Sequence, residues 1–412
     1  MPVFATSDTR ILHRSYMRFS DVIIIACAIL FFTMFDGFVR FGHVAPAIWM
    51  MAYGLVALGF IASPERSIFI VLQHWPVFLL PALAIVSTMW TSAPIRTPIA
   101  GFQLFMTTLI AVMISQQLNI RQLMLAIFIG QTFGLVFSLL NITASVIPAS
   151  SAANGSLIGI YGHKTAFGYS AVLSSFARMA WLSYRGQEVW GLLFAILVSP
   201  LVINTQSATA IVSFSIVFAL FFLLTLRRMA PITARRVLLF ITCLAGLALS
   251  MLIMFFQTMT NTVLAALGKT TTLTGRTELW QIAIDIWRDA PILGVGFSAF
   301  WHSNEHAMSV KYIHVYVDDR LDGFHNAFLE CLVALGVIGV MILGAIVLIS
   351  ILRLCAMTFL YLSHDAMIWL CVLVFYVMVA MLIQDVGFKQ HSGSFMMMVF
   401  CYIYAMPFNR RA

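Results

Sequence analysis

Residues 327–352 read AFLECLVALGVIGVMILGAIVLISIL, a run in which Glu330 is the single charged residue. A helix needs about 20 consecutive apolar residues to cross the hydrocarbon core of a bilayer. Because lipid cannot hydrogen-bond to the backbone, a spanning segment must satisfy its own polar groups, as a helix does. The stretch therefore predicts a transmembrane helix, and with it an all-α membrane protein.

The rest of the chain repeats this pattern. Hydrophobic residues make up 62% of the 412 residues and charged residues only 9%, whereas ordinary soluble domains are about 25% charged. Twelve spans are predicted in all, so the chain is expected to be polytopic and to form one integral membrane domain over 1–412. The windows are 21–37, 44–62, 75–90, 99–117, 123–147, 163–183, 189–204, 207–226, 236–257, 327–352, 364–384 and 392–407.

The arginines and lysines predict the orientation. If the N-terminus is cytoplasmic and the spans alternate, fourteen of the 23 basic residues fall in cytoplasmic termini and short loops. Only four fall in short loops on the other side, as the positive-inside rule requires. Both termini are therefore expected in the cytoplasm. The long connection 258–326, between the ninth and tenth spans, is expected on the opposite face.

Several classes of partner are disfavoured by the same composition. The net charge of +8 comes mostly from these arginines, and no basic stripe with interleaved aromatics predicts a nucleic-acid partner. The six cysteines lie in predicted spans without a Cys-x-x-Cys pair, which favours packing over disulfides or metal binding. His302-Ser-Asn-Glu305-His306 has the spacing of a zinc motif, yet its loop offers no soluble core for a third ligand. No metal or cofactor is expected.

One helix is predicted inside the long loop, over residues 276–290. Trp280, Ala283, Ile284 and Trp287 recur at i, i+3, i+4 and i+7, which predicts an apolar stripe that lies on the bundle.

Arg276 stands at the first turn of this helix, where a cation is unfavourable beside the positive end of the helix dipole. An anion held by the guanidinium and the free N–H groups of that turn would resolve the conflict. The loop therefore predicts binding of a phosphate at a membrane surface.

Four motifs in and after the loop resemble the signature of the O-antigen ligase and polymerase superfamily, bacterial inner-membrane glycosyltransferases. They are Thr274-Gly-Arg-Thr-Glu-Leu-Trp280, Pro291-x-x-Gly294-x-Gly296, Gly323-Phe-His-Asn-Ala-Phe-Leu329 and Gly336-x-x-Gly339. Trp90-Thr-Ser-Ala-Pro94 and Gly159-x-x-Gly162-His163-Lys164 are also similar, most closely to the ExoQ-like exopolysaccharide branch.

The resemblance implies a reaction. It is the polymerisation of undecaprenyl-diphosphate-linked oligosaccharide repeats into exopolysaccharide, without a metal, at the periplasmic face of the inner membrane. The implied partners are this lipid-linked oligosaccharide and membrane lipids, with a chain-length regulator and export machinery as further candidates. Arg276 would bind the diphosphate, and His325 would take the proton of the attacking sugar hydroxyl. The supporting residues would be His163, Glu278, Trp280 and Asn326.

The chain departs from the family at one position. Many relatives carry a second arginine in a turn that opens the eighth span, but here that turn reads Gln206-Ser-Ala-Thr209. Lys164, predicted at an outer helix end, could supply the missing charge for the diphosphate, as a point charge and not as a bidentate fork.

Two alternatives remain open. A ligase of the same family would transfer the glycan to lipid A-core or another acceptor, and acceptor choice cannot be read from the residues. A lipid-linked oligosaccharide flippase would be expected to place charges deep in its spans. Here the charges gather instead in the long outer loop, which disfavours the flippase.

Overall fold

The computed structural model describes residues 19–34, 43–151, 155–226, 276–303, 323–361, 363–382 and 388–406. Over these residues the chain is helical, and the one β-bridge joins Ser150 to Leu157. The predicted all-α class is confirmed. In chain order the elements are α1 (Phe19–Met34), α2 (Val44–Ala62), α3 (Pro64–Gln73), η2 (Trp75–Phe78), α4 (Leu79–Val86), η3 (Ser87–Met89), α5 (Arg96–Gln117), α6 (Ile120–Ala144), α7 (Lys164–Ser183), α8 (Glu188–Asn204), α9 (Ala208–Leu226), α11 (Arg276–Asp289), η5 (Phe300–His302), α13 (Ala327–Phe359), α14 (His364–Leu382) and α15 (Gly393–Tyr404).

Each predicted span that falls on described residues coincides with helical residues, and the 236–257 window lies outside them. In the described part of the chain, α2, α5, α6 and α13 are long and apolar enough to cross a membrane. The chain is thus a multi-pass membrane protein, while the full set of twelve spans stays a prediction. The helix predicted at 276–290 is observed as α11, and most of the remaining 258–326 connection lies outside the described residues.

The sequence did not predict α3. Residues 64–73 were expected to connect two spans, but Pro64 opens a helix there, as proline does at a first helical position. This helix meets the helical stretch 75–89 at a bend of 83°. The two pieces together form either one broken span or a re-entrant segment.

The last predicted span, 392–407, is a shorter helix than expected. α15 has 12 residues, about 18 Å at 1.5 Å per residue, against a hydrocarbon core of about 30 Å. The His391 N–H donates to Thr107 Oγ1 (3.0 Å), halfway along α5, and the Tyr404 hydroxyl donates to Leu118 O (2.6 Å), just past the end of α5. Within the described residues, α15 therefore runs beside only half of α5.

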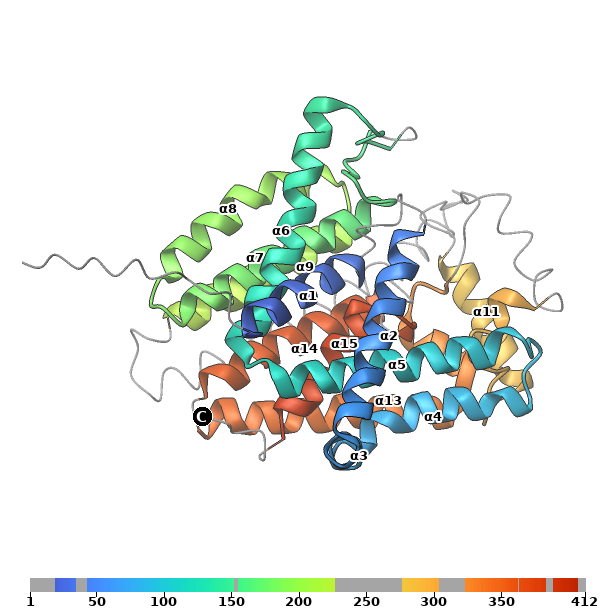
Figure 1. Ribbon diagram of the computed structural model, residues 1–412. Helices are drawn as coiled ribbons and strands as arrows, with labels where there is room; N and C mark the ends of the chain where they lie inside the picture. The colour runs from blue at the N-terminus through green and yellow to red at the C-terminus, as the bar shows by residue number, and fades with distance from the viewer. Residues whose placement is uncertain are drawn as a thin grey trace, which may run out of the picture.

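The helices form two neighbouring groups (Figure 1). α7 packs against α6, α8 and α9, drawn in green, and α1 lies along α6. α13 packs against α4, α14 and α15, and α5 lies against α4 and α15.

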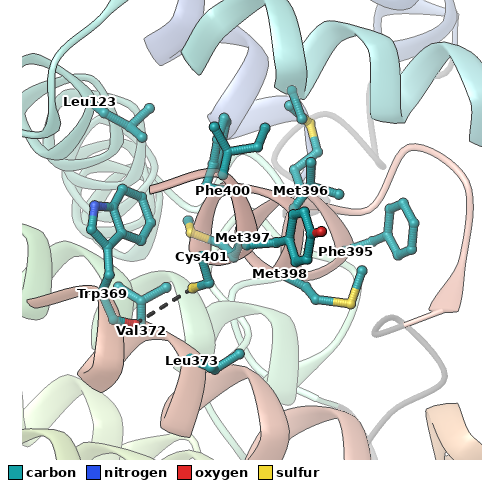
Figure 2. Close-up of a cluster of buried hydrophobic side chains, with 14 of the residues drawn as sticks. Leu123, Trp369, Val372, Leu373, Phe395, Met396, Met397, Met398, Phe400 and Cys401 are labelled. Atoms are coloured by element: carbon teal, nitrogen blue, oxygen red, sulfur yellow. Dashed lines mark hydrogen bonds between the residues drawn. The ribbon is translucent and has the colours of Figure 1, made fainter. Parts of the chain in front are cut away.

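A core of sulfur-containing and aromatic side chains fills the space around α15 (Figure 2). Met396, Met397, Phe400 and, from α14, Trp369 are buried there, with the ring centroids of Phe400 and Trp369 6.1 Å apart. The Cys401 thiol points at the Trp369 carbonyl, 3.6 Å away. The described cysteines are free thiols, as the packing prediction expected, and Cys243 lies outside the described residues.

Candidate functional site

The site begins at a break in α13. Gly336 has φ 63° and ψ −163°, so the helix is interrupted one-third of the way along its length. A break leaves backbone N–H and C=O groups without helical partners, and buried groups of this kind need other ones. The segment 291–296 supplies them through four backbone hydrogen bonds. These are Val295 N–H to Val333 O (2.9 Å), Gly296 N–H to Ala334 O (3.0 Å), Val337 N–H to Pro291 O (3.0 Å) and Ile338 N–H to Ile292 O (3.4 Å).

The glycines of the two motifs are required by this close approach. A Cβ on Gly336 would lie 2.2 Å from Ile292 O, and a Cβ on Gly294 would lie 2.5 Å from Val333 O. Both glycines also have positive φ, which other residues rarely adopt. The Pro291-x-x-Gly294-x-Gly296 motif and Gly336 thus form one joint between the loop and α13.

The Trp90–Pro94 element docks on the same segment from the turn between α4 and α5. The Trp90 indole N–H donates to Leu293 O (3.3 Å), and the Phe297 N–H donates to Ser87 Oγ (3.0 Å). In Figure 1, α11 lies at the same end of the bundle as this turn. Motifs about two hundred residues apart in sequence therefore meet at one end of the bundle.

α11 packs on this joint through an apolar face. Leu279 and Ala283 are fully buried in a cluster with Phe300, Phe324 and Val333. The predicted stripe is confirmed at Trp280 and Ala283.

The stripe differs from the prediction at its other positions. Ile282 and Ile286 join the cluster in place of Ile284 and Trp287. The Trp287 indole N–H instead donates to Pro291 O (3.1 Å), just past the end of α11. The sequence placed the centre of the buried face wrongly because α11 contacts the irregular segment 295–301 as well as α13.

One hydrogen bond joins α11 to the turn that carries His325. The Trp280 indole N–H donates to Phe324 O at 2.9 Å. Arg276, the first residue of α11, precedes Trp280 by one helical turn. The backbone of Arg276 therefore lies on the segment that is fastened directly beside His325. The side chains of Arg276 and Glu278 lie outside the described residues.

The His325 turn is fixed on both sides. His325 is half-buried and has φ 54°, a left-handed conformation that histidine adopts uncommonly. Before it, the Phe324 N–H donates to Glu330 Oε2 (3.2 Å). After it, Asn326 caps α13, since its Oδ1 accepts the Phe328 and Leu329 N–H groups at 3.0 and 3.1 Å. Strained residues held this firmly are common at functional sites.

Glu330 is the residue that the sequence prediction missed. Its carboxylate accepts the Phe324 N–H through Oε2 and the Trp301 indole N–H through Oε1 (2.8 Å). It thereby ties α13, the His325 turn and the 297–302 segment together. The sequence did offer one signal for Glu330, which is the single charged residue in the apolar run 327–352. A charge inside such a run needs a specific partner.

A polar pocket of about 270 Å³ opens beside Glu330. It carries the cations Arg96 and Lys389, the Glu330 carboxylate and the indole of Trp301. Arg96 is the exposed first residue of α5, and Lys389 lies in the irregular segment before α15. The remaining lining residues are Phe297, Ser298, His302, Ala334, Phe388 and Gln390.

His302 lies at the rim of this pocket. Its Nδ1–H donates to Ser298 O (2.9 Å), while Glu305 and His306 of the predicted zinc-like pattern lie outside the described residues. Across the part of the chain that is described, no three His, Cys, Asp or Glu side chains gather closely enough to hold a metal ion.

The other predicted site residues lie at the start of α7. His163 is the N-cap of that helix, and its Nδ1 accepts the Thr165 N–H at 3.2 Å. Lys164 is the first helical residue, four positions before Gly168 and on the same face. A Cβ on Gly168 would lie 2.5 Å from Ala210 Cβ and 3.6 Å from Thr205 Oγ1. Lys164 therefore lies one turn from the 205–210 region, in which this sequence has no arginine.

The helices and the polar junction define the class: a multi-pass helical membrane protein in which the Trp90–Pro94, Pro291–Gly296 and Gly336 motifs meet at one end of the bundle. Residues 192–344 match the O-antigen ligase family. The chain is 28% identical over 277 residues to the exopolysaccharide production protein ExoQ of Rhizobium meliloti (strain 1021). That match covers 65% of this chain and 62% of the relative. The two matches show that the chain is similar to the O-antigen ligase family and to ExoQ, and so support the resemblance.

Proposed function

We propose that the protein polymerises undecaprenyl-diphosphate-linked oligosaccharide repeats into exopolysaccharide. The observation that carries this proposal is the hydrogen bond from Trp280 to Phe324. It fastens the anion-binding start of α11, with Arg276, next to the turn that presents His325. The proposal therefore gives Arg276 and His325 one shared site, in which Arg276 stabilises the diphosphate and His325 accepts the proton.

The reaction forms a bond between the acceptor hydroxyl oxygen and the anomeric carbon of the donor glycan. The bond from that carbon to the diphosphate oxygen breaks, and undecaprenyl diphosphate leaves with the electron pair. His325 takes the hydroxyl proton. Arg276, the N–H groups of the first turn of α11 and Lys164 stabilise the negative charge on the leaving diphosphate. The diphosphate is a good leaving group, so the proposed mechanism uses no metal.

The pocket beside Glu330 is the proposed site for the acceptor sugar. Its volume of about 270 Å³ is just below the range of pockets that hold drug-sized ligands, so one sugar residue would fill it. The Trp301 ring offers a flat apolar wall, while Arg96, Lys389 and Gln390 offer polar groups for hydroxyls. Glu330, which lines this pocket, also accepts the N–H of Phe324, the residue directly before His325.

The proposed location is the bacterial inner membrane, with both termini in the cytoplasm and the site at the periplasmic face. Ile95 is 80% exposed beside the α4–α5 turn, and Gln187 is exposed in the α7–α8 turn. In cells with a permeabilised outer membrane, Ile95→Cys should react with an impermeant thiol reagent. Gln187→Cys should react only after the inner membrane is lysed. The reversed pattern would contradict the orientation and the mechanism together.

Ligation is the second candidate, and the family match supports it because the matched family is described as O-antigen ligase. The two reactions use the same donor and differ in the acceptor. They therefore leave different intermediates when the enzyme fails. A failed polymerase leaves single lipid-linked repeats, and a failed ligase leaves long chains still attached to lipid.

The deciding experiment replaces Arg276 in cells that lack the native gene. Arg276→Ala should stop high-mass polysaccharide and let single lipid-linked repeats accumulate, at unchanged protein level. Arg288→Ala is the matched control, since Arg288 is an exposed arginine at the other end of α11, paired with Asp285 at 3.0 Å. Long lipid-linked chains from Arg276→Ala would assign the protein to ligation. Normal polymer from Arg276→Ala would refute the proposed site.

A further inference from the structure

A groove of about 460 Å³ runs between α7 and α8, away from the junction described above. It combines a polar mouth with an apolar floor. The lining residues are Arg178, Leu182, Gln187, Trp190, Leu193, Phe194 and Leu197.

The floor is one face of α8. Trp190, Leu193, Phe194 and Leu197 recur at i, i+3, i+4 and i+7, so they form a strip about 10 Å long. Trp190 is 66% exposed and Leu197 is 74% exposed. The strip starts at the turn between the helices and runs toward the middle of α8. Its length and direction fit the upper part of an acyl chain.

Arg178 lines the mouth of the groove, and Arg185, which is not a lining residue, stacks on the same indole as Arg178. The guanidinium of Arg178 lies 5.2 Å from the centroid of the Trp181 ring, and the guanidinium of Arg185 lies 4.3 Å from the same centroid. Arg178 also lies 4.8 Å from the Phe128 ring. Two like charges are thus held on one indole by stacking, although they repel each other. An anion between them would relieve that repulsion.

A nearby carboxylate is engaged elsewhere. Asp365, in the first turn of α14, accepts the Tyr184 hydroxyl at 2.5 Å. Arg121 stacks on the ring of the same tyrosine, 4.6 Å from its centroid. This second cluster provides a matched arginine at the same end of the helices that does not line the groove.

We propose that the α7–α8 groove binds one anionic phospholipid, with its phosphate between Arg178 and Arg185 and one acyl chain along the α8 strip. Basic pockets between membrane helices recognise such headgroups, and arginine and tryptophan are typical of the membrane interface. A free anion would not use the apolar strip, and a second copy of this chain would not need the paired arginines. In the predicted orientation the lipid belongs to the cytoplasmic leaflet. The proposal does not depend on the proposed glycosyl transfer.

The test is native mass spectrometry of the purified full-length protein in detergent, titrated with phosphatidylglycerol or with phosphatidylcholine of identical acyl chains. Phosphatidylglycerol should bind at least about fivefold more tightly than phosphatidylcholine, since each arginine near a headgroup contributes about that factor. Arg178→Gln should weaken phosphatidylglycerol about fivefold and leave phosphatidylcholine unchanged. Arg121→Gln should leave both unchanged. Leu197→Asn should weaken both lipids.

The proposal fails if the two lipids bind equally, or if Arg121→Gln weakens phosphatidylglycerol as much as Arg178→Gln does. Displacement of the lipid by millimolar inorganic phosphate would assign the mouth to a free anion. A dimer peak that Arg178→Gln abolishes would assign the groove to a second copy. Thermal unfolding of each variant checks folding. If Arg178→Gln does not fold, Arg185→Gln, exposed in the turn, should show the same selective loss.

Discussion

The starts of α7 and α13 both carry a histidine at or beside the helix cap, but only one of the two histidines does the capping. His163 stands directly before α7, and His325 stands one residue before the cap of α13. At α7 the His163 ring is the cap, since it accepts the Thr165 N–H. At α13 Asn326 does the capping, so the His325 ring is not required for it. A histidine beside a helix is therefore a stronger catalytic candidate when another residue caps that helix.

The two starts also differ in how they are held. At the α13 start, Trp280, 44 residues away, and Glu330 of the first turn both hold Phe324, the residue directly before His325. At the α7 start the contacts act farther from the histidine: the Ile160 N–H donates to Ser138 Oγ (3.2 Å), and Tyr161 is hydrogen-bonded to Ser170 (2.6 Å). Long-range fastening restrains a side chain to one geometry, as a reacting group requires.

The largest expected difference between the two starts is in activity. His325→Ala should lower the polymerisation rate by about 10²–10⁴, the usual contribution of a general base. His163→Ala should retain most of the polymer, because it removes only a cap. Both can be measured as polysaccharide mass on gels from cells with matched protein levels. The double variant His325→Ala with Arg276→Ala should be no worse than either single one, because residues of one site act together. Normal polymer from His325→Ala would show that His325 is not the general base.

Lys164 tests whether the α7 start contributes charge to the same reaction. Lys164→Ala should reduce polymer formation by about 10²–10³, the typical loss for one stabilising donor. Lys164→Arg should retain part of the activity, because a positive charge remains although its geometry differs. Polymer yield against expression level is the measurement. If the alanine variant equals the wild type, Lys164 is an interface anchor and the missing arginine has no substitute there.

Replacing the glycine at the break in α13 should destabilise the protein more than replacing an ordinary helical glycine. Gly336→Ala should lower the free energy of unfolding by about 1–3 kcal/mol or more, since it forces a strained conformation and a contact with Ile292 O. Gly344 is the control on the same helix, because a Cβ there meets nothing within 4 Å. Gly344→Ala should be neutral or slightly stabilising. The measurement is thermal unfolding in detergent, and equal effects of the two variants would argue against the joint.

The smallest expected effect concerns the cap of α13. Asn326→Ala should cost about 1 kcal/mol of stability, because two N–H groups lose their acceptor. Asn326→Asp should restore most of that loss, since aspartate is an equally good cap. The unfolding temperature and the polymer yield of both variants measure this. An alanine variant that loses all activity but no stability would show that Asn326 acts on the substrate and not as a cap.

The sequence predicted the class and the helix positions well because they depend on local hydropathy. It failed at α3, where a proline-started helix looked like a connection. It also misplaced part of the α11 stripe. These failures share a cause: each depends on what the segment packs against, and periodicity does not contain that information.

By itself, the sequence determined an all-α membrane protein, its relationship to the O-antigen ligase family, and His325 and Arg276 as candidates. These follow from composition and from motifs that are contiguous in the chain. Only the tertiary structure assigned Glu330 to the His325 turn, His163 to capping, and Gly294 and Gly336 to one joint. The first two are hydrogen bonds within a turn, which form only in the backbone conformation that the turn adopts. The joint is a long-range backbone contact, which arises because a broken helix must satisfy its free backbone groups with the segment that lies beside it.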